Sequence, residues 1–417
     1  MNMSALGGLR VIEFGRFIAA PYCCQLLADA GADVFKIEPL SGDDARRNGT
    51  RISETEARQF LNKNRNKRSI ACNLNDATVK RAILQLLAGA DVVVANFRPG
   101  QADKLGFGYD TLKASNPGLI YAENSGFGTR GPLAGVAGMD MAVQGYSGLA
   151  HLTADGPSPL VDPVIDYTAA LLMAWGVSTA LYHRERTGQG QRLDVSLLQA
   201  ALVLQNNHIN HIDAVDAQRH EFVDYLKTAF SEGASWQDVI DHQRPSGPLQ
   251  VYYGFFRAAD GVFCLAPGSR GLQRKVLEVV GLEDPAVEQP HFQPDDPAAH
   301  DARMKAQFNA VLEKYSAAHW VEVFKAHGVP VSNLNLKPHV LDDQQVWENG
   351  YLSRIEHPQV GGMTVVAPPV QFSETPLEVR SASPGLGQHT ADILSEGGLT
   401  PAEIQTLANR GTVVGVN

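Results

Sequence analysis

Cysteine is scarce and follows no ligand or redox pattern. The 417 residues include four cysteines, and no two of them have the CxxC spacing. Adjacent Cys23 and Cys24 are poorly placed to bridge each other. We therefore expect reduced thiols that pack as small apolar groups on a helix, rather than a disulfide framework.

Positive charge is also in short supply. Lys and Arg number 35 against 45 Asp and Glu, which gives a formal net charge of −10. A nucleic-acid partner needs a basic face, so this balance argues against one. The N-terminus, MNMSALGG, shows no secretory pattern, and the most apolar stretch, residues 169–182, is shorter than the roughly 20 residues of a bilayer span. These absences predict a cytoplasmic protein with no membrane partner.

Several familiar motifs are missing. The turn after the first strand candidate reads FGRFIAAP rather than GxGxxG, which argues against NAD binding. There is no P-loop and no GxSxG elbow. His208 and His211, with Asp213 near, lack a clear third ligand, so no metal site is predicted. The glycines of GQGQ, residues 188–191, indicate a turn that ends a helix.

The first half of the chain alternates β-rich and helical runs. DVVVANF, residues 91–97, is almost continuously apolar, as in a strand that is buried on both faces of a parallel sheet. Asp76 is placed to cap the helix that follows the third strand. The pattern predicts an α/β sheet with crossover helices. We expect strands at 9–14, 33–38, 69–74, 91–97 and 118–127, a long helix over 166–186, and another over 193–211.

The composition changes after residue 219. Residues 219–246 are polar and irregular, and a hairpin is predicted around Asp260 and Gly261. Residues 272–327 are mostly helical in pattern, and the tail returns to strands and a final helix near 402–408. We expect three segments: 1–215 and 329–417 in a large α/β domain, and 225–328 in a small inserted domain.

The run KNRNKR, residues 63–68, holds four cationic side chains in six positions. A solvated, charged loop is the ordinary interpretation of such a run. The alternative is a site for a phosphorylated ligand, because Arg and Lys bind phosphate through charge-assisted hydrogen bonds. Both interpretations stay open at this point.

Asp166 stands directly before an apolar helix, in PLVDPVIDYTAALLMAWG. That place is typical of a helix N-cap. A cap also exposes its carboxylate at the positive end of the helix dipole, where it could take part in chemistry. The two roles are compatible.

A series of segments, taken in order, resembles the class III CoA transferases, the CaiB/BaiF family that includes formyl-CoA transferase-like proteins. The resemblance runs from about residue 6 to about residue 395, and it depends on the order and spacing of the segments. They are LGGLRVIEFGRFIAAPYCCQLLADAGADVFKIEPLSGDDAR, NKRSIACNL, DVVVANFRPG, LGFGYDTLKASNPGLIYAENSGFG, GMDMAVQGYSGL, the Asp166 segment, YHRERTGQGQRLDVSLLQAAL, HPQVGGMTVVAPPVQFSETP and LGQHT.

The resemblance implies a large Rossmann-like parallel-sheet domain built from both chain ends, a small inserted α+β domain, and an interlocked homodimer. Asp166 matches the catalytic aspartate. Pro39 stands where relatives often carry a basic residue. The segments that correspond to CoA-binding positions contribute Arg16, Phe17, Ile18, Ala19, Cys72 (within 71–74), Asn96, Phe97, Arg98 and Lys104. Substrate selectivity is expected at Arg16, Tyr146 and His151, and at Gly247 in the segment 245–250, which matches the family's glycine-rich lid.

The resemblance further implies that coenzyme A moves from an acyl-CoA to a small free carboxylic acid, with CoA as a substrate and no permanently bound cofactor. Asp166 would form a mixed anhydride and then a CoA thioester. The donor and the acceptor acid are left open. One rival function is an α-methylacyl-CoA racemase, which needs a histidine where this chain reads Gly138-Met139-Asp140. Another is a non-catalytic CoA-binding protein.

Overall fold

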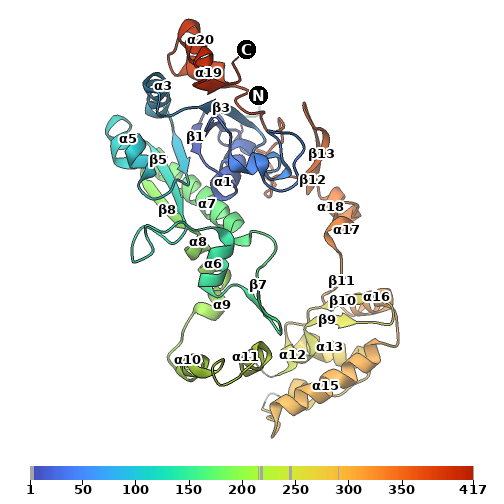
Figure 1. Ribbon diagram of the computed structural model, residues 1–417. Coiled ribbons are helices and arrows are strands. Elements are labelled where there is room, and N and C mark those ends of the chain that lie inside the picture. The colour runs from blue at the N-terminus through green and yellow to red at the C-terminus, as the bar shows by residue number, and fades with distance from the viewer. Residues whose placement is uncertain (1–3, 215, 217–218, 244–246, 290, 417) are drawn as a thin grey trace. The chain divides into compact units, whose positions relative to one another are not determined.

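The computed structural model describes residues 4–214, 216, 219–243, 247–289 and 291–416. By its internal contacts the chain divides into two compact units. The larger unit combines Met1–His220 with Trp347–Asn417, and the smaller unit is Glu221–Val346. Both ends of the chain therefore belong to the larger unit, as the N and C labels of Figure 1 show.

A seven-stranded sheet forms the centre of the larger unit, in the order β14-β3-β2-β1-β4-β5-β8. All neighbouring strands run parallel except β14, which lies antiparallel to β3. The strands are β1 (Arg10–Phe14), β2 (Asp33–Glu38), β3 (Lys67–Cys72), β4 (Val92–Ala95), β5 (Ile120–Ser125), β8 (Arg192–Ser196) and β14 (Val413–Val414).

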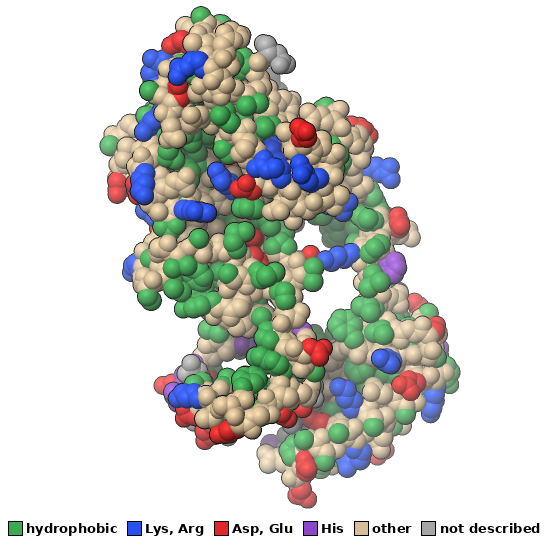
Figure 2. All heavy atoms as spheres, viewed as in Figure 1, with side chains coloured by type: hydrophobic (Ala, Val, Ile, Leu, Met, Phe, Trp, Pro, Cys, Tyr) green, Lys and Arg blue, Asp and Glu red, His purple; other side chains and the backbone are tan. Residues whose placement is uncertain are grey.

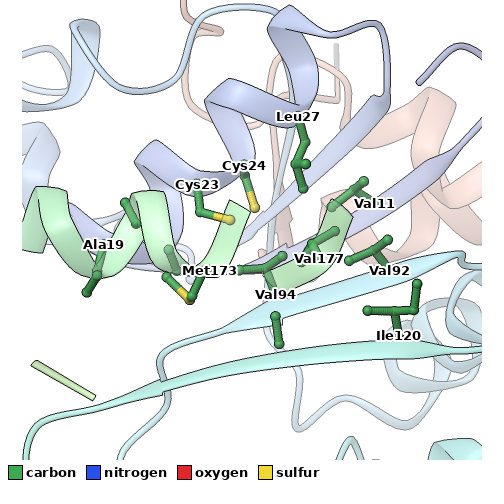
Figure 3. Packing of buried hydrophobic residues seen from close by; sticks show 14 of the residues in the cluster. Val11, Ala19, Cys23, Cys24, Leu27, Val92, Val94, Ile120, Met173 and Val177 are labelled. Carbon is green, nitrogen blue, oxygen red and sulfur yellow. The ribbon is translucent and has the colours of Figure 1, made fainter. Parts of the chain in front are cut away.

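Helices cover both faces of this sheet. Because side chains alternate along a strand, Val92 and Val94 of β4 enter one core and Val93 enters the other. The first core, shown in part in Figure 3, packs β-strand side chains against α1 (Ala19–Asp29), α7 (Val164–Thr187) and α8 (Leu197–Leu204). The second core packs against α3 (Ala77–Ala88), α5 (Tyr109–Ser115), α19 (Thr390–Glu396) and α20 (Pro401–Asn409).

Most of the predicted strands and helices are confirmed. The expected third strand is shifted two residues toward the N-terminus, Asp76 caps α3 through hydrogen bonds from Thr78 and Val79, and Cys23 and Cys24 are buried as free thiols on α1. Two expectations about these elements are wrong: residues 219–246 are not irregular but contain the helices Arg219–Thr228 and Trp236–Gln243, and residues 193–196 belong to strand β8, not to a helix. There the edge of the sheet decides, because Leu193 pairs with Ala122 of β5, and the next helix begins only after Ser196, which caps it.

Among the described residues of the larger unit, α7 is the longest helix. It ends at Gly188, which has a left-handed conformation, as the glycine turn predicts. It begins at Val164, before the expected start. Its 24 residues are long and apolar enough to cross a membrane, so the length argument from residues 169–182 was wrong. The core helix of a soluble protein passes the same test, and Ala169, Met173 and Val177 of α7 are buried in the first core.

The smaller unit has its own sheet and core. Strands β9 (Gly254–Arg257), β10 (Val262–Leu265) and β11 (Val331–Asn333) form an antiparallel sheet, which confirms the hairpin around Asp260 and Gly261. Aromatic side chains fill the core beneath it. The helices are α10 (Arg219–Thr228), which begins just before the unit, α11 (Trp236–Gln243), α12 (Pro248–Tyr252), α13 (Arg270–Val280), α14 (Pro285–Glu288), α15 (Pro297–Leu312), α16 (Ala317–Ala326), α17 (Lys337–Val340) and α18 (Gln344–Glu348), which ends just after the unit.

Shorter elements complete the larger unit. Four of them are strands that form two hairpins, β6 with β7 and β12 with β13. These elements are the 3₁₀ helix η1 (Asp44–Arg47), α2 (Arg58–Leu61), α4 (Gln101–Leu105), α6 (Asp140–Ser147), α9 (Asn206–Ile209), β6 (His151–Thr153), β7 (Gly156–Ser158), β12 (Leu352–His357) and β13 (Gly361–Val366).

A buried layer of charge lies across strands β1, β2 and β3. The Lys36 ammonium is 2.7 Å from Glu13 and 3.0 Å from Asp43, and Lys67 is 2.7 Å from the other oxygen of Glu13. Lys36 also donates to the carbonyl oxygen of Gly15 at 2.9 Å. A buried charge is tolerated only when it is paired and hydrogen-bonded, so these contacts tie the ends of three strands to one another.

The cationic run at residues 63–68 is part of this buried layer. Lys63, Arg65 and Lys67 are almost fully buried, so a solvated loop is the wrong interpretation. Arg65 lies 2.7 Å from the buried carboxylate of Asp29, and Lys67 is committed to Glu13. Paired in this way, Arg65 and Lys67 hold the chain together and are not open to a phosphorylated ligand.

We predict that Lys36→Met lowers the free energy of unfolding by roughly 3–5 kcal/mol, because it leaves two buried carboxylates without a shared cation. Urea denaturation followed by circular dichroism measures the change. Lys113→Met, at an exposed lysine on α5, removes the same charge and should leave the midpoint almost unchanged. Equal midpoints for the two variants would contradict a structural role for the buried layer.

Candidate active site

The loop after β1 lies at the carboxyl edge of the parallel sheet, where the loops after β3 and β4 also emerge. In open α/β sheets ligands bind at this edge. Phe17 in the loop has a φ of 62°, an unusual conformation for a residue other than glycine. Such strain persists only where the surroundings over-determine the backbone, and it is frequent at ligand sites.

Two side chains fix this loop. The Asn96 amide, from the end of β4, accepts a hydrogen bond from the Arg16 N–H at 2.9 Å and donates one to the Arg16 carbonyl at 2.8 Å. Asp43 accepts from the Phe17 N–H at 3.1 Å and is held in turn by Lys36. The Asn96 side-chain amide thus bonds the Arg16 backbone on both sides and holds the shape of the loop.

The other predicted CoA-binding residues differ in whether their side chains are exposed to solvent. Arg16, Arg98 and Lys104 are exposed cations, and Arg16 lies 3.3 Å from Asp44. Ile18, Ala19 and Cys72 are buried, so only their backbone groups could face a ligand. Phe97 packs on Phe14 with ring centroids 5.3 Å apart.

Asp166 lies in the first turn of α7 and is not its N-cap, so the capping prediction was wrong. Pro163 holds the N-cap position, and a carboxylate from another helix does the capping. Asp140, at the start of α6, accepts hydrogen bonds from the N–H groups of Ile165 at 2.9 Å and Asp166 at 3.1 Å. Gln144 donates to its other oxygen at 2.6 Å. The cap leaves the Asp166 carboxylate free of the helix end.

The surroundings of Asp166 favour its protonated form. Burial and then the like charge of Asp140 raise the pKa of the half-buried Asp166, the cation of Lys63 lowers it, and together these effects place the pKa at about 7. Burial also lowers the pKa of Lys63 to about 8. A carboxyl group whose pKa lies near neutrality is a candidate for chemistry.

The racemase alternative finds no histidine at this position. Met139 is the N-cap of α6 and is mostly exposed, and a thioether cannot carry a proton. The charged groups that shift the pKa of Asp166 are Asp140 and Lys63. An acid/base pair of histidine and aspartate is therefore not supported here.

The remaining sequence candidates are Tyr146, His151 and Gly247. Tyr146 on α6 is exposed and meets Phe127 edge to face, at 5.3 Å between centroids. His151 is exposed on β6. Gly247 belongs to the smaller unit, where its N–H donates to Asp301 at 2.6 Å. Residues 245 and 246 of the expected lid lie outside the described residues.

The histidine pair does not gain a metal partner. His211 lies 3.2 Å from Asp213, and among the described residues no three His, Cys, Asp or Glu side chains form a group that could hold a metal ion. The two groups that sequence reasoning missed are Lys63 and Asp140. Each stood in a segment that had been noted, but nothing local indicated that either one faces Asp166.

Comparisons with known proteins identify the family of this chain. Residues 6–390 match CoA-transferase family III. Human succinyl-CoA:glutarate CoA-transferase is 29% identical over 400 residues, which cover 95% of this chain and 86% of that protein. Acetyl-CoA:oxalate CoA-transferase of Acetobacter aceti is 34% identical over 333 residues, 78% of this chain and 80% of that protein.

A solved structure gives the same picture. A CaiB/BaiF family protein from Brucella suis has a TM-score of 0.72 and 30% identity, with 95% of this chain and 100% of that chain covered. The fold, the site and the matches together define an enzyme of the CoA transferase type. The chain belongs to CoA-transferase family III.

We predict that Asp166→Asn stabilises the protein above pH 7. The folded-state pKa is raised from 3.8 to about 7, so the native state binds the proton more tightly than the unfolded chain does. Ionisation of Asp166 therefore costs stability, with no cost below about pH 4 and the full cost above about pH 7. The variant should gain on the order of 3 kcal/mol at pH 8 and little at pH 4.

Melting temperatures of both proteins between pH 4 and pH 8 measure this difference. Asp110→Asn, at an exposed position of α5, is the control and should show no such trend. A constant difference between Asp166→Asn and the parent protein across this range would contradict a raised pKa.

Proposed function

We propose that this enzyme transfers CoA from an acyl-CoA to a free carboxylic acid through covalent intermediates on Asp166. The observation that carries the proposal is the place of this carboxylate. It is half-buried in the first turn of α7, its pKa is raised, and no ion pair in the described structure occupies it. A carboxylate in direct contact with a cation would be a poorer nucleophile.

The chemistry balances without a further reactant. An oxygen of Asp166 attacks the thioester carbonyl carbon, a C–O bond forms, the C–S bond breaks, and the electron pair leaves on the CoA sulfur. The thiolate then attacks the Asp166 carbonyl of the mixed anhydride and releases the donor carboxylate. The acceptor acid reverses the two steps. Holding the reactants in place can lower such barriers by several kcal/mol.

Each step passes through an oxyanion that needs hydrogen-bond donors. The first N–H groups of α7 do not provide them, because those of Ile165 and Asp166 already donate to Asp140. The oxyanion donors in this proposal therefore come from other backbone N–H groups around the site.

The loop of residues 16–19 and the exposed cations Arg16, Arg98 and Lys104 support a CoA site at the same edge of the sheet. CoA carries three phosphate groups, and Arg and Lys side chains bind phosphate through charge-assisted hydrogen bonds. Binding energy from this remote part of CoA can offset the cost of orienting the thioester.

The acceptor is a small carboxylic acid, with Tyr146 and Gly247 as selectivity positions. The human relative is named for succinyl-CoA and glutarate, and the Acetobacter relative for acetyl-CoA and oxalate. The two compact units, in this proposal, are a large CoA-binding domain and a small inserted domain. The enzyme acts in the cytoplasm and needs no permanently bound cofactor.

We also propose a homodimer. Helix α7 leaves Leu171, Trp175 and Tyr182 exposed, and Val203 and Leu204 of α8 are exposed as well. Figure 2 shows apolar side chains gathered over the part of the larger unit where Figure 1 places α6, α7 and α8. Extended apolar surface of this kind marks an interaction site, and a second copy of the chain is the occupant that fits the proposed interlocked dimer.

Asp166→Ala should lower CoA transfer by at least about 10³-fold, because it removes the carboxylate on which the proposed covalent intermediates form. A panel of acyl-CoA donors and free acids, followed by mass spectrometry, measures the exchange. The same experiment should detect a CoA-sized adduct on the peptide that contains Asp166.

Asp110→Ala is the matched control and should retain full activity. Near-normal turnover of Asp166→Ala would remove the aspartate from the mechanism. No acid-dependent exchange by the parent enzyme across a wide panel would favour a non-catalytic CoA-binding protein.

Sedimentation at micromolar concentration should give twice the chain mass of 45.0 kDa. Trp175→Glu places a charge in the apolar surface of α7 and should lower the dimer content by at least tenfold. Gln405→Glu, which adds the same charge on the exposed face of α20, should leave the dimer intact. A monomeric parent protein would contradict the homodimer.

A further inference from the structure

Lys63 differs from the other buried cations of its segment. It lies between α2 and β3, and its ammonium donates hydrogen bonds to three neutral acceptors. These are the Gln59 carbonyl at 3.3 Å, the Gln59 side-chain oxygen at 2.8 Å and the Asn62 side-chain oxygen at 2.8 Å. Arg65 and Lys67, in contrast, contact carboxylates directly at 2.7 Å. In the described part of the chain no carboxylate forms an ion pair with Lys63.

The position of Lys63 explains what its charge acts on. The ammonium lies 5.7 Å from the ring centroid of Tyr167, which directly follows Asp166. The carboxylates that act on it through space are Asp166 and Asp43. Asp43 already contacts Lys36 at 3.0 Å, so Asp166 is the one whose charge is not otherwise balanced.

We propose that Lys63 is a positioning residue whose fixed cation balances the single negative charge that the reaction moves between Asp166 and the leaving group. The inference rests on the proposed function and adds a residue to it. Lys63 acts through Asp166 and through the charge of the intermediates, and it does not contact the reacting atoms.

The charge balance of the reaction gives the reason. Before attack the negative charge is on Asp166. After attack Asp166 is a neutral anhydride and the charge is on the CoA sulfur, and in the next step the charge leaves on the donor carboxylate. One anion is present throughout, so a cation that does not move stabilises every state on the path.

The offset between Lys63 and Asp166 suits this role. A direct ion pair would occupy the oxygen that must attack and would lower its reactivity. A cation that Gln59 and Asn62 hold, and that acts on Asp166 through space without an ion pair, stabilises the charge and leaves the oxygen free. Because the three hydrogen-bond acceptors are neutral, they do not cancel the positive charge.

The other ionisable groups around the pair are few. Asp140 of α6 raises the pKa of Asp166, and burial does the same. On the side of α1, Tyr22 meets Tyr167 edge to face at 4.9 Å, and Asp162 precedes the helix and acts on Tyr167. Among these groups Lys63 is the one cation that lowers the pKa of Asp166.

The test compares Lys63→Met and Lys63→Gln, which remove the charge, with Lys63→Arg, which keeps it. Lys63→Gln also retains a donor for Gln59 and Asn62, so it remains informative if Lys63→Met fails to fold. Lys113→Met is the control for loss of an exposed lysine. Each change is made in the parent protein and in Asp166→Asn.

The first measurement does not depend on turnover. The difference in melting temperature between each protein and its Asp166→Asn partner, followed from pH 4 to pH 9, reports the pKa of Asp166. We expect the pH midpoint of this difference to move upward by about one pH unit in Lys63→Met and Lys63→Gln, and to stay in place in Lys63→Arg and Lys113→Met.

The second measurement is the pH profile of kcat/KM for CoA transfer. The acid limb should move upward by the same amount in Lys63→Met and Lys63→Gln, with a loss of about tenfold at pH 6. An alkaline limb near pH 8 is expected in the parent enzyme, because Lys63 loses its proton there, and it should disappear in Lys63→Arg.

Unchanged midpoints in folded Lys63→Met and Lys63→Gln would overturn the proposal. A shifted midpoint with an unshifted kcat/KM profile would also overturn it, because Lys63 would then act on the resting aspartate alone. A shifted midpoint in a protein that transfers no CoA would overturn the proposed function, and with it the role of Lys63 in the reaction. Shifts in both measurements support it.

Discussion

Charge that is buried within strands β1, β2 and β3 and the loops that follow them must be balanced, and this requirement organises the larger unit. Lys36 and Lys67 neutralise Glu13, Lys36 neutralises Asp43, and Asp43 fixes the backbone of Phe17. The strained loop after β1 therefore depends on ion pairs one layer below it. Asp166 is the exception, because its nearby cation is held away from direct contact, and that exception is the basis of the proposed chemistry.

The cap of α7 has two effects that belong together. Asp140 satisfies the N–H groups of Ile165 and Asp166, which fixes the direction in which the helix begins. Its negative charge also raises the pKa of Asp166, and Lys63 limits the rise. The helix start that holds Asp166 is thus the same structure that sets its ionisation. A change to Lys63 would alter the ionisation of the carboxylate and leave this cap in place, whereas a change to Asp140 would also remove the cap.

Local patterns in the sequence predicted much of the fold. Apolar runs located β1, β2, β4 and β5, Asp76 marked the start of α3, and Gly188 marked the end of α7. The strand β8 was missed because LDVSLLQAAL has strong helical character, and only the free edge of β5 made its first residues a strand. The ordered resemblance to a family pointed to Asp166. The surroundings of Asp166 could not be predicted. Lys63 is about a hundred residues away along the chain, and local sequence patterns do not show that the two side chains come near each other in the folded protein.

The sequence by itself determined the α/β class, most of the strand-forming segments and the aspartate in the first turn of the long apolar helix. These follow from periodicity, capping residues and the order of motifs, all of which act over a few residues. The tertiary structure alone decided that the run at residues 63–68 is buried, that Asn96 shapes a loop, and that Asp140, not Asp166, caps α7. These contacts join groups that are far apart in the sequence and buried together in the fold. In a buried, low-dielectric environment an unpaired charge or N–H group raises the free energy of the folded state, so each group pairs with a partner that the tertiary structure places beside it.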